Sequence, residues 1–327
     1  MSDYASLPTI TALARAGAVE RAWSLFNGSG HAARHDPASL AVKGRLLKSR
    51  ARLAPARRRA DGFAAAAQAY AEANAIEPAP YLAINAATLH LLSGARDRSQ
   101  HLAREVLAQL DGPEPPVDTP YYLAATQAEA LLLLDDQTGA ARAMEAAVAA
   151  APEGWADWAV TLGQLEEICA AQDRDCGWLD RFRPPASLHF AGHMGVMSGG
   201  AAEQAIVTAV DQLLRTQPIG FAYGALAAGA DIVVAERLLA AGVELHVVLP
   251  SQVDCFEAQS VAPAGEGWAQ RFRTVLDRAS SLRSVTETQN GVHDPLATYL
   301  AGEMAIGAAM LNAQRYDASA LQLALVD

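Results

Sequence analysis

The chain has 327 residues, of which 51% are hydrophobic and 19% charged, so it is long enough for two domains with separate cores. Its formal net charge of −11 argues against a general nucleic-acid binder, because non-specific phosphate binding depends on clustered cations. The sequence shows no signal-peptide pattern, no apolar run of transmembrane length and no C-x-x-C pair among its three cysteines. We therefore expect a cytoplasmic protein that binds neither membranes nor metals.

Residues 1–182 are predicted to form helical hairpins. They are rich in Ala, Leu, Gln and Glu, which favour helices, and apolar residues recur at helical spacing. Turn-forming residues divide this region at Asn27-Gly28, Glu77-Pro78, Asp111-Gly112-Pro113 and Ala151-Pro152.

Two of these hairpins end in the same order of small, large and small residues before a proline. The pattern occurs at Ala66, Tyr70, Ala73 and Pro78, and again at Ala140, Met144, Ala147 and Pro152. It resembles the second helix of a tetratricopeptide repeat, whose unit is about 34 residues. We predict roughly three or four degenerate repeats, whose curved surface binds a protein partner. An unrelated helical bundle is the alternative.

A basic cluster stands out in this region. Eight cations fall within 17 residues, namely Lys43, Arg45, Lys48, Arg50, Arg52, Arg57, Arg58 and Arg59. One interpretation is a solvated helix end and loop. The other is a docking site for an acidic partner or a polyphosphate.

A short linker at residues 183–186, which contains Pro184-Pro185, precedes a second domain at 187–327. Here the pattern alternates between strands and helices. Strands are predicted at 188–191, 219–223, 244–249, 284–286 and 321–326. Helices are predicted at 201–216, from 226 or 231 to 241, at 267–280 and at 294–312, with a loop after Pro250. This order predicts a Rossmann-like α/β domain with a mainly parallel sheet covered on both faces.

Glycines follow the first two strands, at Gly192, Gly195 and Gly224. In open parallel sheets, ligands bind at the carboxyl ends of the strands, beside helix N-termini. Residues 187–327 hold 14 acidic and only 7 basic side chains, so a phosphate here would depend mainly on backbone N–H groups. The alternative is that these glycines serve tight turns only.

Four segments of this domain resemble the SLOG superfamily of Rossmann-like domains, which is related to the cytokinin-activating LOG proteins and to the DNA-processing protein DprA. They are F-x-G-H at 190–193, G-A-D-x-x-x-A-E at 229–236, L-x-V-V-L-P at 245–250 and W-x-x-R-F at 268–272. The resemblance implies a sensor of nucleotide-derived signals. The resemblance also implies that the protein belongs to a bacterial signalling or antiviral conflict system. In such systems these domains are fused to helical repeats, TIR-type effectors or class III cyclases.

The sequence departs from the LOG hydrolases at one motif. Those enzymes carry P-G-G-x-G-T-x-x-E after the fourth strand, whereas residues 284–300 read SVTETQNGVHDPLATYL. The resemblance therefore does not extend to hydrolase activity, and no catalytic residue is assigned.

The candidate ligand-binding residues lie in the loops after the first three strands and in the helices that follow. They are Gly192, His193, Met194, Tyr223, Gly224, Ala225, Asp231, Glu236, Pro250, Ser251 and Arg271. Tyr223 either stacks on a base or belongs to the core. Asp231 either caps its helix, which we favour, or contacts a ribose. Arg271 is the expected side-chain cation for a phosphate.

These features predict a bacterial signalling protein. Its α/β domain would bind a nucleotide, cyclic nucleotide or ADP-ribose-type ligand, with no tightly bound cofactor. Its repeats would relay binding to a protein partner, to a C-terminal effector such as a class III cyclase, or to another subunit of a homo-oligomer. Two alternatives remain open: a hydrolase of a nucleotide or NAD derivative, and a ligand-free assembly scaffold.

Overall fold

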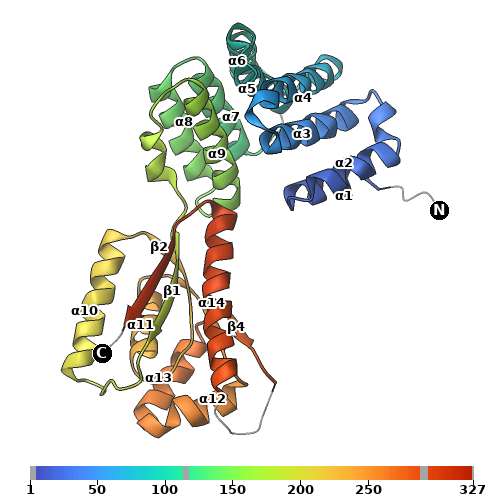
Figure 1. Cartoon of the computed structure of the whole chain (residues 1–327). Helices are drawn as coiled ribbons and strands as arrows, with labels where there is room; N and C mark the ends of the chain where they lie inside the picture. Colours follow the sequence, from blue (N-terminus) through green and yellow to red (C-terminus); the bar gives the residue numbers. More distant parts are fainter. Residues whose placement is uncertain (1–4, 113–117, 288–293, 326–327) are drawn as a thin grey trace. The chain divides into compact units, whose positions relative to one another are not determined.

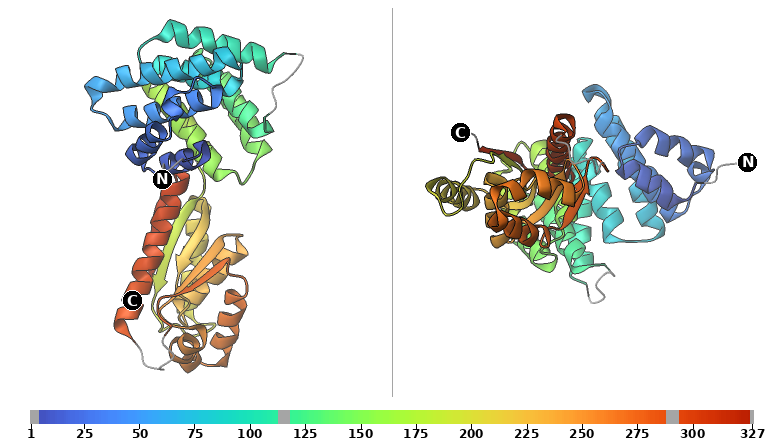
Figure 2. Two further views of the ribbon diagram at one scale, coloured as in Figure 1. Left: turned by 90° about the vertical axis from the view of Figure 1, so that its right-hand side faces the viewer. Right: turned by 90° about the horizontal axis from the view of Figure 1, so that it is seen from below.

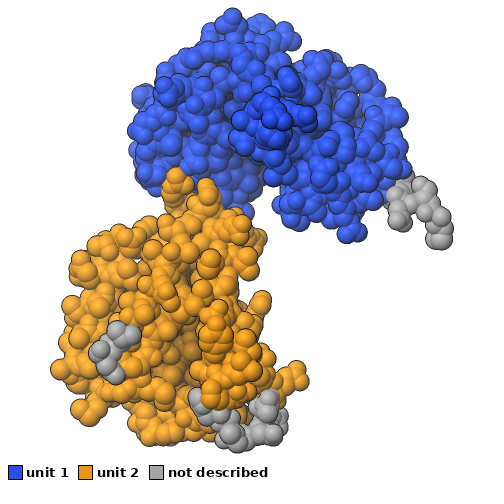
Figure 3. Space-filling model, in the orientation of Figure 1, with its two compact units in different colours: residues 1–182 blue, residues 183–327 orange. Residues whose placement is uncertain are grey.

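The computed structural model describes residues 5–112, 118–287 and 294–325. Its contacts divide the chain into two compact units, unit 1 at residues 1–182 and unit 2 at residues 183–327, which Figure 3 draws in blue and orange. Each unit buries its own hydrophobic core.

Unit 1 is helical (Figure 1). Its elements are α1 (Leu7–Arg15), α2 (Val19–Gly28), the 3₁₀ helix η1 (His31–Ala33), α3 (Pro37–Leu53), α4 (Ala56–Ile76), α5 (Pro80–Leu92), α6 (Arg96–Leu110), α7 (Pro120–Leu133), α8 (Gln137–Ala150), α9 (Trp155–Ala171) and the 3₁₀ helix η2 (Gly177–Phe182). Helices α3, α5 and α7 each begin with a proline, whose fixed φ suits the first helical position. Two of these starts are capped, by the side chains of Asp36 and Thr119.

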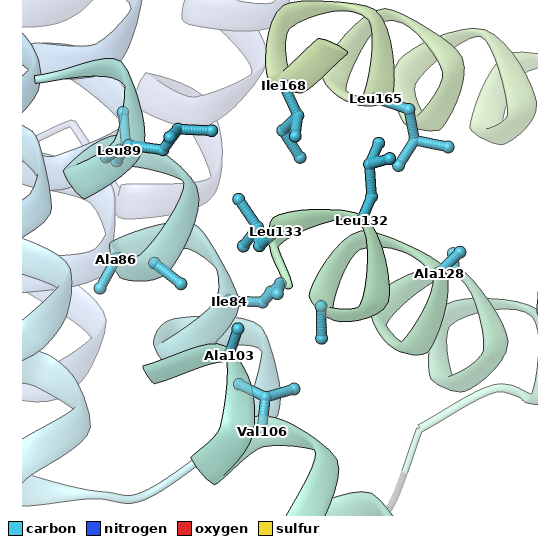
Figure 4. Close-up of a cluster of buried hydrophobic side chains, with 14 of the residues drawn as sticks. Ile84, Ala86, Leu89, Ala103, Val106, Ala128, Leu132, Leu133, Leu165 and Ile168 are labelled. Carbon is cyan, nitrogen blue, oxygen red and sulfur yellow. The ribbon is translucent and has the colours of Figure 1, made fainter. Parts of the chain in front are cut away.

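The repeated pattern lies on the second helices of two hairpins. Ala66, Tyr70 and Ala73 on α4 are buried, and so are Ala140, Met144 and Ala147 on α8. Gly44 lets α3 approach closely, because a Cβ there would lie 2.7 Å from the Tyr70 ring. Figure 4 shows how Leu89, Leu133 and Ile168, from α5, α7 and α9, join one core. The predicted helical repeat architecture is confirmed.

Unit 2 alternates strands and helices. Its elements are β1 (Ala186–Gly192), α10 (Ala201–Thr216), β2 (Ile219–Gly224), α11 (Ala230–Ala240), β3 (Glu244–Leu249), α12 (Val253–Ser260), the 3₁₀ helix η3 (Ala262–Ala264), α13 (Glu266–Leu276), β4 (Ser281–Ser284), α14 (Pro295–Tyr316) and β5 (Ala320–Leu325). The strands form one sheet in the order β4-β3-β2-β1-β5. Every pairing is parallel, and Leu188 of β1 lies opposite Ala222 of β2 and Leu321 of β5. The predicted Rossmann-like parallel sheet is confirmed.

The strand order creates a switch point beside β1. Strands β1 to β4 are added in one direction, whereas α14 returns the chain so that β5 pairs with the other side of β1. Helix α14 packs along β1, β2 and β3, and Figure 2 shows it running beside the sheet. Its alanines at every fourth position, from Ala297 to Ala313, are buried and allow this close approach. Ligands of such folds bind at a switch point, outside the carboxyl ends of the strands.

The structure differs from the sequence prediction in four places. Helix α13 ends at Leu276 instead of at residue 280, because the chain turns there toward β4 and Ser280 N–H already donates to Leu245 O. A short helix, α12, occupies the predicted loop after Pro250. The sequence did not indicate this helix, because its eight residues bury only Phe256 and show little periodicity. Strand β4 lies at Ser281–Ser284 instead of 284–286. Its limits were hard to predict, since this edge strand is half-exposed and lacks an apolar pattern. Helix α14 continues past Asn312 to Tyr316, where the left-handed Asp317 ends it.

None of the helices within residues 5–112, 118–287 and 294–325 combines the length and the apolar character that a bilayer crossing requires.

Candidate functional site

A cavity of about 330 Å³ opens in unit 2 at the carboxyl ends of β1, β2 and β3. Its walls are the loops that follow these strands, helix α12 and the first half of α14. The volume is at the lower end of the range for small-molecule sites. The lining is mostly apolar, with polar groups contributed by several different elements.

The structure brings together six of the residues predicted from sequence. These lining residues are Gly192, Met194, Ala225, Asp231, Pro250 and Ser251. Five others, His193, Tyr223, Gly224, Glu236 and Arg271, are not part of the lining. A role in ligand binding stays a prediction for all of them.

Sequence reasoning missed the wall formed by α12 and α14. It includes Cys255, Gln259, Asp294, Thr298 and Gly302. The α12 residues were assigned to a loop. The α14 residues lie beside β1 because the chain crosses back over the sheet. The sequence predicts the strands, but it does not predict the order of the strands in the sheet.

The glycines of the site interlock the loops after β1 and β2. A Cβ on Gly192 would lie 2.4 Å from the Cβ of Ala230, and one on Gly224 would lie 2.7 Å from the carbonyl oxygen of Phe190. Gly229 has φ +111° and packs on the backbone of His193, whose carbonyl accepts from Ala230 N–H at 3.1 Å. These glycines are thus required by chain packing.

Gly192→Ala is expected to destabilise unit 2 by about 1–3 kcal/mol, the usual effect of overpacking, because the added methyl overlaps Ala230. Gly195→Ala is the matched control in the same loop, where the nearest atom is at 3.5 Å. Differential scanning calorimetry of the full chain would measure both. Equal stability of the two variants would contradict this assignment.

Asp231 joins the same two loops from inside. Its carboxylate accepts from Gly192 N–H at 2.8 Å and from Ala227 N–H at 3.2 Å, and the residue is 6% exposed. The favoured prediction that Asp231 caps its helix is wrong, because the chain turns at Gly229 and places Asp231 in the first turn of α11. Burial raises the pKa of Asp231 to about 7, although the two amides oppose this effect.

This shift predicts a pH-dependent stability. The folded state holds the Asp231 proton more tightly than the unfolded state, so this group's contribution is full below pH 4 and is lost as pH rises to about 7. Asp231→Asn removes the titration. Its stability relative to the parent should therefore improve by about 2–3 kcal/mol from pH 5 to pH 8, as measured by urea unfolding. Asp277→Asn, an exposed control, should show no such change. A pH-independent difference for Asp231→Asn would refute the assignment.

Arg271 and Glu236 form an ion cluster that is separate from the cavity lining. The guanidinium donates from Nε and Nη2 to both Glu236 oxygens, at 2.8 and 2.6 Å, and from Nη2 to Glu203 at 2.7 Å. It lies over the Trp268 ring, and its hydrogen bonds to Glu236 raise its pKa. The cluster links α13, α11 and α10. Arg271, the expected phosphate cation, is therefore already engaged by two carboxylates.

Tyr223 also lies outside the cavity lining, where it contacts a side chain of the neighbouring strand. The Tyr223 ring stacks on His246 of β3, with centroids 4.6 Å apart, and is 7% exposed. The Nδ1 of His246 lies 2.8 Å from Ser281 Oγ on β4. This supports a core role for Tyr223 over stacking on a ligand base.

His189 lies in the cavity wall on β1, and sequence reasoning did not select it. Burial lowers its pKa, which favours the neutral ring, and its Nδ1 lies 3.4 Å from Gln322 on β5. Among the described residues, no three His, Cys, Asp or Glu side chains are arranged to hold a metal ion.

In unit 1, the basic cluster is divided between internal and surface contacts. Lys48 donates to Asn85 Oδ1 at 3.0 Å and to Gln164 Oε1 at 3.4 Å, and burial lowers its pKa to about 8. Arg52 pairs with Glu167 at 2.6 Å, and Arg45 donates to the Tyr81 hydroxyl at 2.7 Å. Much of the cluster thus serves contacts within unit 1.

Comparison with known proteins gives one match, in the helical region. Residues 5–90 match the model of a family described as Tetratricopeptide Repeats-Sensor. The matched segment ends inside α5 and covers well under half of the chain. No curated protein and no solved structure matches the chain. The comparisons therefore support the repeat assignment of unit 1 and do not address unit 2.

Proposed function

We propose that the chain is a bacterial signalling sensor of the cytoplasm. Unit 2 binds a small nucleotide-type molecule in the cavity, and the repeats of unit 1 bind a protein partner. The observation that carries this proposal is the cavity itself, which opens at the carboxyl ends of parallel strands, beside the switch point at β1. The description of the family matched by residues 5–90 supports a sensory role.

The relay requires that ligand and partner binding are coupled. A ligand shifts the populations of two arrangements of the chain only if it binds one of them more tightly. The partner on unit 1 is another protein, a C-terminal effector such as a class III cyclase, or a further copy of the chain. Each of these would read out the same change.

The site chemistry supports binding over hydrolysis. Asp231 is a lining carboxylate, but its oxygens are occupied by two backbone amides. His189 is buried in the wall and lies near Gln322. A general base needs a free lone pair within reach of the proton that it removes. The contacts of Asp231 and His189 therefore suit structural roles better than the role of a general base.

A ligand panel tests the proposal. The full chain is heated with nucleosides, nucleotides, cyclic nucleotides, NAD and ADP-ribose, and hits are titrated by calorimetry. At least one compound should raise the melting temperature, since a ligand that binds only the folded state stabilises it. Chromatography of the mixtures should recover the compound unchanged. Product formation would instead establish a hydrolase, and no shift with any compound would favour a ligand-free scaffold.

A further inference from the structure

The cavity of unit 2 has acidic side chains in its lining. These residues are Asp231 and Asp294, and no Lys or Arg is among the described residues that line it. A phosphate placed in this cavity would meet the negative charge of Asp294, and that of Asp231 above about pH 7.

Three arginines of unit 2 are already engaged by carboxylates. Arg271 is held by Glu203 and Glu236, and Arg237 pairs with Asp211 at 2.7 Å. Arg273 pairs with Glu257 at 2.5 Å. Moving one of these guanidinium groups to a phosphate would break an existing ion pair.

Several backbone amides beside the cavity are also engaged by carboxylates. A phosphate in a fold of this kind is normally held by N–H groups at helix starts and glycine turns. Asp231 accepts from Gly192 and Ala227 N–H beside α11, at 2.8 and 3.2 Å. At α14, Asp294 accepts from Leu296 and Ala297 N–H, at 2.9 and 3.3 Å.

The same arrangement recurs at α10, outside the cavity lining. Glu203 accepts from Gly199 N–H at 2.6 Å, just before that helix begins. At α14 the carboxylate caps the helix itself, whereas Asp231 and Glu203 accept from amides that lie outside α11 and α10. The sequence predicts that backbone amides hold a phosphate, but several of these amides already donate to a carboxylate of the protein.

We infer that the cavity recognises an uncharged, nucleoside-like ligand and disfavours a phosphate attached to it. This inference rests on the proposed function and specifies the chemistry of the same site. The apolar lining, including Phe190, Val248 and Phe256, suits the faces of a flat ring. Ser251, Gln259 and Thr298 offer hydroxyl and amide groups to N–H and O–H donors on that ring or its sugar.

A matched titration tests the inference. Calorimetry of the full chain with each common nucleoside and its 5′-monophosphate, at one pH and salt concentration, measures the effect of one phosphate. The best nucleoside should bind at least about tenfold more tightly than its own monophosphate. A monophosphate that binds as tightly as its nucleoside, or more tightly, overturns this inference and leaves the proposed function standing. Binding by no member of the series overturns this inference, whereas the proposed function is overturned only if no compound of the wider panel binds.

One substitution tests whether the carboxylate of Asp294 causes the preference for the nucleoside. Asp294→Asn keeps a side chain that can cap α14 but removes the negative charge. The preference for nucleoside over monophosphate should narrow by about threefold or more in this variant. Asp277→Asn, which is exposed and not part of the lining, should keep the parent preference. An unchanged preference in Asp294→Asn would overturn the electrostatic explanation.

Discussion

Gly302→Phe is expected to abolish ligand binding to unit 2 while the fold is retained. Gly302 lies on α14 in the cavity wall, and a Cβ built there meets no atom within 4 Å. The phenyl ring can therefore enter the cavity without displacing the core. Because glycine is a poor helix former, the substitution should also favour α14 locally, by up to about 1 kcal/mol. We expect calorimetry to show at least about a 100-fold loss of affinity, or about 2.7 kcal/mol.

The control for this variant lies on the same helix. Gly307 also has no atom within 4 Å of its Cβ position, but it does not line the cavity. Gly307→Phe should therefore bind the ligand as the parent does. Equal binding by both variants would mean that the ligand site lies elsewhere.

Glu129→Ala is expected to destabilise unit 1 by about 3–5 kcal/mol, because it removes one partner of a buried polar network. Glu129 on α7 is buried, and its carboxylate accepts from Thr88 Oγ1 on α5 and from Gln164 Nε2 on α9 at 2.5 Å. Gln164 Oε1 in turn accepts from Lys48 on α3. Removal of this side chain leaves the Thr88 hydroxyl and the Gln164 amide without their shared acceptor, and Lys48 without a carboxylate that favours its charged form.

Two further variants make the Glu129 result interpretable. Burial raises the pKa of Glu129 and so favours its neutral form, which Glu129→Gln imitates in shape and acceptor capacity. That variant should cost clearly less than Glu129→Ala in urea unfolding. Glu145→Ala removes an exposed carboxylate that pairs with Arg181 at 2.8 Å, and should cost no more than about 1 kcal/mol. A similar cost for all three would contradict a buried network.

Much of the fold could be predicted from the sequence, because hydrophobic periodicity records which face of an element is buried. Helix α10 and strand β3 have the predicted limits. The weak points were α12 and β4, where few side chains are buried and the pattern is faint. Tertiary contacts, not local preference, define those elements.

The candidate site was only partly predictable. Glycines and the strand–helix order located the three loops that reach the cavity, but the same glycines are explained by close contacts such as that of Gly192 with Ala230. Sequence could not show that Arg271 is held by Glu203 and Glu236, which lie 68 and 35 positions away. It also could not place α14 over β1, because the strand order is a property of the folded chain.

Hydrogen–deuterium exchange of the full chain, with and without a saturating nucleoside from the panel, tests the cavity as the ligand site most directly. Bound ligand should slow exchange in residues 190–194, 225–231, 250–260 and 295–305, which contain most of the lining. The same nucleoside at the same concentration should leave Gly302→Phe unchanged. Slower exchange that is confined to other segments, or that persists in Gly302→Phe, would contradict the assignment of this cavity as the sensory site.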